Sequence, residues 1–199
     1  IYYSLIASLL GVAVSAAPLE KTHVSGNAKW LAHLDAKAFQ ESTIGEYLIG
    51  VFKKEIFQTG ESPVSFDIDR LLEELHSLTA YGAAFDLTPR KDSVLIVRTG
   101  TKARSIIDAY IASEELDKDG KTGIKVLEDK DYLTYLLSNE VYVSFPEDGL
   151  IVTSKSFDRI ESAMEVIEGK AENLVESGSE LILSDDSGFF FLATVNGID

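Results

Sequence analysis

Residues 93–99 read Ser-Val-Leu-Ile-Val-Arg-Thr, and this stretch decides the fold that the sequence predicts. Its four consecutive apolar residues are typical of a strand that is covered on both faces. Thr101 follows as a helix-capping residue, and an amphipathic helical pattern comes after it. Residues 150–152 and Ser156 repeat this order of strand, hydroxyl residue and helix. We therefore expect a ββα unit that the chain uses twice.

Strands and helices alternate on both sides of this stretch. The expected strands are residues 28–35, 78–87, 93–99, 124–127 and 132–137, with two more in a hairpin at 140–155. The expected helices have caps at Asp35, Thr43, Asp67, Thr101 and Ser156, and the helix from Thr43 carries one apolar stripe at Tyr47, Leu48, Val51, Phe52 and Ile56. This order predicts an α+β fold: an antiparallel sheet with helices packed on one face, ferredoxin-like or an elaboration of it.

The last strand pattern of the chain resembles the first. Residues 191–196 (Phe-Leu-Ala-Thr-Val-Asn) match residues 30–35 (Trp-Leu-Ala-His-Leu-Asp) in size or polarity at each position. We expect an α+β domain over residues 28–185, and a strand within 186–199 that either completes the sheet or opens a second module. The uncharged window that begins at Phe189 and ends at Val195 is strongly β-prone, so as an unprotected edge it predicts self-association.

The first residues predict a targeting segment rather than part of the fold. Residues 1–17 carry no charge, and the apolar block at 5–14 has the length of a signal-peptide core. Cleavage after Ala16 would place Val14 and Ala16 at the two positions that a signal peptidase inspects. We expect a signal peptide at 1–17 that lacks its basic n-region, then a flexible linker at 18–27, and an exported protein in the periplasm or outside a bacterial cell. The alternative is an uncleaved membrane anchor.

Composition excludes several classes of function. The chain has 199 residues, 45% of them hydrophobic, which suffices for a packed core. The absence of cysteine excludes disulfides, thiolate metal sites and a cysteine nucleophile. A formal net charge of −15 argues against nucleic acid and against anionic membrane surfaces as partners. We expect no membrane span once the signal peptide is removed.

Catalytic motifs are absent from the sequence. It contains no phosphate-binding glycine loop, no Gly-x-Ser-x-Gly elbow and no His-Glu-x-x-His pair. Its three histidines are His23 in the expected linker, His33 in the first strand and His76 at the end of a helix. His33 shares a strand face with Asp35, as a general base and its orienting carboxylate would. We favour a structural role for both, as a core histidine beside a helix-capping aspartate, and assign no catalytic residue.

One acidic segment resembles part of a calcium loop. Glu115, Asp117 and Asp119 would occupy its first, third and fifth positions, ahead of Gly120. Val126 then falls where a bidentate glutamate is required, so we favour a solvated turn and expect no cofactor. An alternative function, a hydrolase that uses carboxylates and a metal, requires Asp117, Asp119 and the acids at 128–131 to converge.

Two stretches give a resemblance to a group of proteins. Residues 28–35, followed by Phe39, Ser42 and Gly45, resemble the opening of certain uncharacterised exported bacterial proteins with repeated α+β modules, as do residues 150–154 and the helix after them. The resemblance implies export and a repeated fold, and it carries no catalytic signature. The sequence therefore predicts an exported, non-catalytic module that acts by binding or scaffolding, with a protein or an envelope component as its partner.

Overall fold

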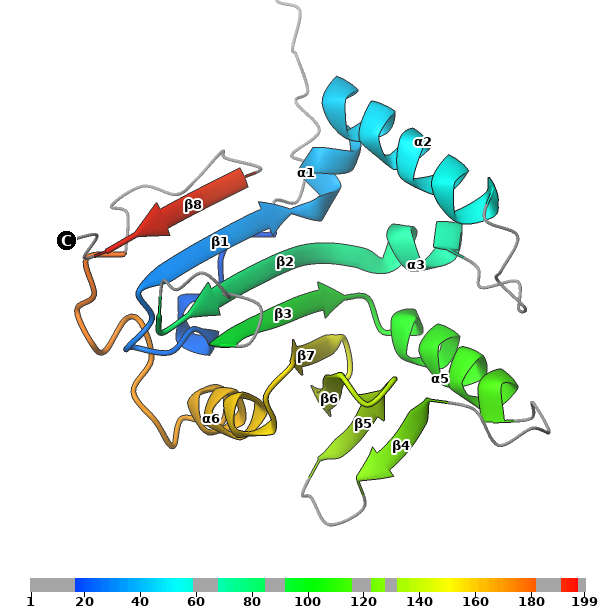
Figure 1. Cartoon of the computed structure of the whole chain (residues 1–199). Coiled ribbons are helices and arrows are strands. Elements are labelled where there is room, and N and C mark those ends of the chain that lie inside the picture. Colours follow the sequence, from blue (N-terminus) through cyan, green and yellow to red (C-terminus); the bar gives the residue numbers. More distant parts are fainter. Residues whose placement is uncertain are drawn as a thin grey trace, which may run out of the picture.

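A computed structural model describes residues 17–58, 68–84, 92–115, 123–127, 132–181 and 191–196. The fold is α+β, and eight strands form one antiparallel sheet in the order β4-β5-β6-β7-β3-β2-β1-β8 (Figure 1). The strands are β1 (Trp30–Asp35), β2 (Leu75–Gly82), β3 (Ser93–Thr99), β4 (Ile124–Leu127), β5 (Leu133–Leu137), β6 (Val141–Glu147), β7 (Leu150–Ser154) and β8 (Phe191–Val195).

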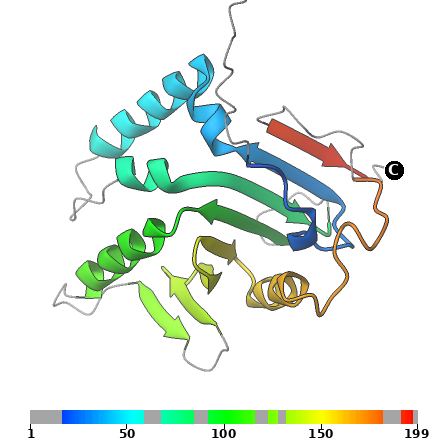
Figure 2. The same cartoon turned by 180° about the vertical axis from the view of Figure 1, so that it is seen from behind.

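The helices connect these strands and cover parts of the sheet. They are η1 (Lys21–His23), α1 (Ala36–Gln40), α2 (Thr43–Gln58), α3 (Ile68–Glu74), α5 (Lys102–Glu115) and α6 (Phe157–Ile167). Short α1 follows β1 directly and leads into the longer α2, while α6 packs on β7, β3 and β6 and also contacts η1 (Figures 1 and 2).

The main core lies between the central strands and α6. Val152 of β7 pairs with Ile96 of β3, and both side chains are buried. Ile160 and Met164 of α6 pack against them. This face is the apolar layer that the strand and helix periodicities predict, because alternate strand residues and one helical stripe meet there.

A second core lies on the opposite face, under α5. Ile111 of α5 packs with Tyr135 and Phe145, together with Val143 of β6. Val143 precedes Ser144, whose partner Val152 belongs to the main core. Because successive strand residues point to opposite faces, the two cores lie on the two sides of the sheet. The helices therefore cover both faces, with α6 on the first and α5 on the second, and not the single face that the sequence predicts.

Local signals place several elements correctly. The strands expected at 93–99 and 124–127 are confirmed as β3 and β4. Asp35 is confirmed as the cap of α1, since its Oδ1 accepts a hydrogen bond from the Ala38 N–H at 3.0 Å. The cap of α2 is Ser42 rather than Thr43, because the Ser42 hydroxyl accepts the Gly45 N–H at 3.0 Å.

The start of β2 corrects the expectation for His76. The strand begins at Leu75, directly after α3, so His76 lies in β2 and not at a helix end. The apolar pattern of α3 runs into that of β2 without a glycine or proline between them. For this reason the periodicity gives no boundary at that point.

Three residues of the apolar stripe expected on α2 face solvent, and the side chains of the other two, Phe52 and Ile56, lie outside the described residues. Tyr47 is 70% exposed and Leu48 is 45% exposed, and Ile44 and Val51 are exposed as well. Helix α2 contacts α1 at the end of the sheet rather than either sheet face (Figure 1). An amphipathic pattern normally indicates the side that faces a core, but here that interpretation fails for Tyr47, Leu48 and Val51.

Residues 18–27, expected as a flexible linker, pack against the domain. Val24 is completely buried in the main core. The Leu174 N–H donates to the Val24 carbonyl oxygen at 2.8 Å, and the Gly26 N–H donates to the Glu172 oxygen at 2.9 Å. The segment therefore belongs to the folded unit, although it carries only one short helical turn.

The strand that echoes β1 joins the same sheet. β8 pairs antiparallel with β1, and Ala193 lies opposite Ala32. Each half of the other echo is a hairpin followed by a helix, β2–β3 with α5 and β6–β7 with α6. The two helices lie on opposite faces of the sheet, so the arrangement gives the repeated unit no further support. Within the described part of the chain, no helix has both the length and the apolar character that a membrane crossing needs.

Candidate functional site

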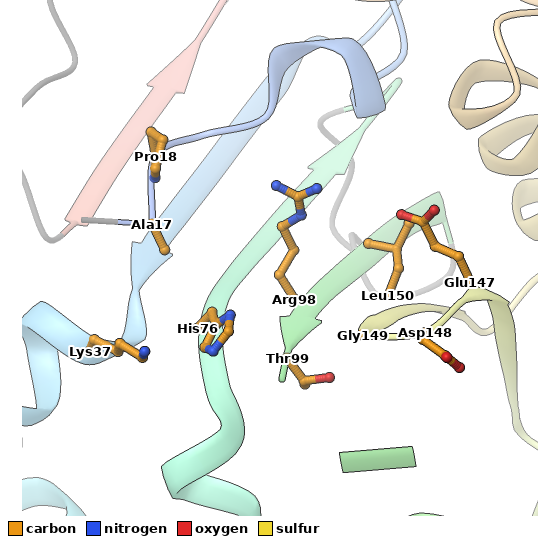
Figure 3. A pocket seen from close by; sticks show the side chains of 10 residues that line it. All are labelled: Ala17, Pro18, Lys37, His76, Arg98, Thr99, Glu147, Asp148, Gly149 and Leu150. Atoms are coloured by element: carbon orange, nitrogen blue, oxygen red, sulfur yellow. The ribbon is translucent and has the colours of Figure 1, made fainter. Parts of the chain in front are cut away.

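A pocket of about 360 Å³ opens where β1 and β3 end, where β2 begins and where β6 turns into β7 (Figure 3). It is lined by the start of the described chain, by α1 and by the ends of four strands. The residues that line it are Ala17, Pro18, Lys37, His76, Arg98, Thr99, Glu147, Asp148, Gly149 and Leu150. This volume lies within the usual range for a site that holds a small molecule.

Three basic side chains from three elements form one wall of the pocket. Lys37 comes from α1, His76 from β2 and Arg98 from β3. Figure 3 shows them on one side, with Glu147 and Asp148 on the other. Lys37 makes no ion pair with another residue that the structure describes, while Arg98 Nη1 lies 3.6 Å from Oε2 of Glu20, the residue before η1. The wall therefore holds a cationic group whose charge is not matched by a described carboxylate.

The pKa of the His76 imidazole lies below its ordinary value, which favours the uncharged form. Burial is the main cause that lowers the pKa of its imidazole, and the neighbouring charge of Lys37 lowers it further. Arg98 acts in the same direction, and Glu74 opposes both. The imidazole adds a third positive charge to the wall only when the pH falls or when a bound anion favours its protonated form.

A tight turn fixes the wall opposite. Gly149 has φ = +79°. This left-handed backbone conformation costs about 1–2 kcal/mol for an L-residue that carries a side chain. Its carbonyl oxygen accepts the Thr99 N–H at 2.8 Å. A Cβ at this position would lie 2.6 Å from the Thr99 oxygen, so β3 and the turn approach too closely for a residue with a side chain. Glycine at this position therefore sets the distance between β3 and the turn.

His33 and Asp35 hold the rim of the pocket together. Both are only 4% exposed, on the shared strand face that their spacing predicts. Asp35 Oδ2 accepts the Ala17 N–H at 2.9 Å, and His33 Nε2 lies 3.1 Å from the Ala17 oxygen. His33 Nδ1 lies 2.9 Å from Thr79 Oγ1. These contacts position the backbone of Ala17 and fit the structural role that we favour for the pair.

Of the three acidic residues in the possible calcium loop, the structure describes only the backbone of Glu115. Glu115 is the last residue of α5, and Asp117 and Asp119 lie outside the described residues, as do residues 128–131. Among the residues that the structure does describe, no cluster of three or more His, Asp or Glu side chains is suited to hold a metal ion.

Sequence reasoning missed the basic wall. Lys37, His76 and Arg98 lie in three separate elements and form no motif of fixed spacing. Each is an isolated polar residue near the end of its element, a position that usually indicates solvent exposure. Only the order of the strands shows that the ends of β1, β2 and β3 meet.

Comparison with known proteins identifies a shared fold and no family. No protein-family model matches the chain, and no curated protein matches its sequence. Crystal form III of TP0453, a Treponema pallidum protein, is similar with a TM-score of 0.51 and 14% identity, over 79% of this chain and 54% of that chain. Crystal form IV of TP0453 gives 0.49 and 13%, over 77% and 53%. The chain thus spans about half the length of TP0453, and the similarity extends to the α+β fold alone.

Proposed function

We propose that the protein is an exported, non-catalytic binding module of the bacterial envelope. The uncharged segment at 1–17, with small residues before its expected cleavage point, supports export. A core built without cysteine suits an envelope protein better than a small cross-linked secreted domain. The absence of sequence motifs for nucleophilic or nucleotide chemistry favours binding over catalysis.

The pocket is the proposed ligand site, and its ligand carries an anionic group. The observation that carries this proposal is the convergence of Lys37, His76 and Arg98 on one wall. The chain as a whole has a formal charge of −15, so the charge of this basic wall is opposite in sign to the net charge of the protein. Carboxylate, sulfate and phosphate groups are bound by such side chains through charge-assisted hydrogen bonds.

Sulfate is a suitable first probe, because its charge stays constant where histidine titrates. We expect sulfate to shift the backbone amide signals of Thr99 and Gly149 in a titration followed by NMR. Lys37→Ala should weaken the affinity about tenfold, the amount expected for one lost charge-assisted contact. Affinity should also rise as the pH falls from about 8 to about 5.5, because protonation of His76 adds charge to the wall.

The matched control is Lys155→Ala, which removes an equal charge from an exposed ion pair with Glu140, Nζ to Oε2 3.1 Å, away from the pocket. The control should bind sulfate like the wild type. Equal losses in the two variants would show that only the overall charge matters, and the proposal for the pocket would then be wrong.

The outer edge of β8 is the surface through which we propose that the protein associates with itself. The Asn196 N–H donates to the oxygen of Lys29, the residue before β1, at 2.8 Å, so the backbone N–H of Asn196 faces the β1 side. Backbone groups that face the neighbouring strand alternate with groups that face away from it along an antiparallel strand. The residues whose backbone groups turn to the outer edge are therefore Phe191, Ala193 and Val195. In the described part of the chain, β8 pairs on one side only.

A second copy of the chain fits this edge. β8 already pairs with β1, a strand of matching sequence, and Ala32 lies opposite Ala193. The same antiparallel arrangement about Ala193 would place Phe191 of one copy opposite Val195 of the other. These two side chains are 55% and 41% exposed, and residues 187–198 contain no charge that would protect the edge.

Paired charges at these positions test the register. We expect the wild type to sediment as a dimer in analytical ultracentrifugation, and the double variant with Phe191→Lys and Val195→Lys to dissociate at least about tenfold more readily, because like charges then lie opposite each other. The matched variant with Phe191→Glu and Val195→Lys places opposite charges there and should restore the dimer. A monomeric wild type, or two variants that dissociate alike, would contradict the proposal.

A further inference from the structure

The backbone of Ala17 is held at both of its polar groups by buried side chains. Its nitrogen lies 2.9 Å from Asp35 Oδ2, and its oxygen lies 3.1 Å from His33 Nε2. Both side chains are 4% exposed. Asp35 uses its other oxygen, Oδ1, to cap α1 through the Ala38 N–H. One carboxylate oxygen of Asp35 therefore caps α1, and the other is directed at the backbone nitrogen of Ala17.

This nitrogen is the atom that the expected processing would change. Cleavage after Ala16 is what the small-residue pattern predicts. Hydrolysis of that amide bond consumes one water molecule and leaves a carboxylate on Ala16 and an amine on Ala17. The amine takes up a proton from solvent near neutral pH, because the pKa of an α-amino group is about 8. A neutral N–H donor would thus become a positive ammonium group at the same position.

We propose that Asp35 is a receptor for the new N-terminus: cleavage after Ala16 produces an Ala17 ammonium group that forms an ion pair with Asp35 and completes the rim of the pocket. The inference rests on the proposed export. An ion pair with a buried carboxylate is stronger than the neutral hydrogen bond it replaces, since the charge of the carboxylate is then matched. The processed chain is consequently more stable than a chain that retains one further residue.

The ammonium group would join an existing set of charges around the pocket. The groups that line the pocket or lie beside Ala17 are His33, Lys37, His76, Arg98, Glu147 and Asp148. Of these, Lys37 and Arg98 disfavour a further cation nearby, whereas Glu147 and Asp148 favour it. Asp35 is the group within hydrogen-bond distance of the Ala17 nitrogen, so it dominates this balance.

The test compares two forms of the protein, one that begins at Ala17 and one that begins at Ala16. Asp35→Asn keeps an oxygen for the cap of α1 and removes the charge. We expect this substitution to lower the thermal midpoint of the Ala17 form by about 5 °C more than that of the Ala16 form at pH 7. Measuring both forms cancels the part of the effect that belongs to the cap and to the burial of Asp35.

A pH series provides a second readout. The ion pair raises the pKa of the ammonium group in the folded state above its unfolded value of about 8. Its contribution to stability is therefore complete below about pH 8 and is lost as the pH rises through the folded value. The midpoint of the Ala17 form should fall above about pH 8 more steeply than that of the Ala16 form, and Asp35→Asn should remove this difference.

Equal responses of the two forms to Asp35→Asn would overturn the inference, as would a protein isolated from cells that begins at another residue. The outcome is independent of the ligand proposed for the pocket. If sulfate fails to bind while the two forms still differ, the ligand proposal is wrong and the receptor for the N-terminus stands.

Discussion

Gly149→Ala should lower the free energy of unfolding by about 3 kcal/mol, measured by urea denaturation. The left-handed backbone of Gly149, with φ = +79°, accounts for about 1 kcal/mol of this loss. The rest comes from the new Cβ, which would lie 2.6 Å from the backbone oxygen of Thr99 and cannot be relieved by rotating a side chain. The turn has to shift, so sulfate binding in the pocket should weaken as well.

Gly169→Ala is the matched control for this prediction. Gly169 follows α6 and also has a positive φ of +70°, but a Cβ there would meet no atom within 4 Å. This substitution should therefore cost only the conformational part, about 1 kcal/mol. Similar losses at Gly149 and Gly169 would show that the close approach of β3 to the turn is not as tight as described.

Leu31→Ala should destabilise the protein by about 3 kcal/mol, whereas Leu48→Ala should change its stability by less than about 0.5 kcal/mol. Both leucines belong to apolar patterns in the sequence, but Leu31 is 1% exposed and Leu48 is 45% exposed. Removing Leu31 opens a cavity in the main core beside Tyr81, its partner in β2. Removing Leu48 takes a side chain from a helix surface that contacts water.

Chemical denaturation of the two variants measures this contrast with the chemistry of the substitution held constant. A loss at Leu48 as large as that at Leu31 would place the apolar stripe of α2 against a core and contradict its described exposure. Thr79→Ala is unsuitable as a control here, because this substitution also removes the contact between the Thr79 hydroxyl and the ring of His33.

The sequence predicts the strands well where apolar residues run without interruption and turn residues follow. Residues 93–99 are such a case, since four apolar residues run to Val97, Gly100 follows the strand, and the strand pairs on both sides. Helix α2 shows the limit of this reasoning. Its periodicity is real, but periodicity states only that one side is apolar and does not identify what lies against it. Which face is covered depends on where α1 directs the helix, which is a property of the whole fold.

The pocket could not be predicted because its residues share no local pattern. Lys37 belongs to α1 and Arg98 belongs to β3, which lie far apart in the sequence. They meet at the pocket because β1, β2 and β3 are neighbours in the sheet. His33 and Asp35 were visible from their alternation on one strand, and the structure places both on the same face. The sequence shows the spacing of residues along one element directly. Contacts between different elements can be predicted only when the order of the strands in the sheet is known.

Strand β6 affects how the protein unfolds. Val143 belongs to the core under α5. The next residue, Ser144, pairs with Val152, which belongs to the core under α6. The strand ends with Glu147, which lines the pocket. The two cores lie on the two faces of the sheet and share β6, so the unfolding of either one disturbs the ladder between β6 and β7. The described domain should therefore melt in a single cooperative transition, and damage beneath α5 should reach the pocket through one continuous backbone.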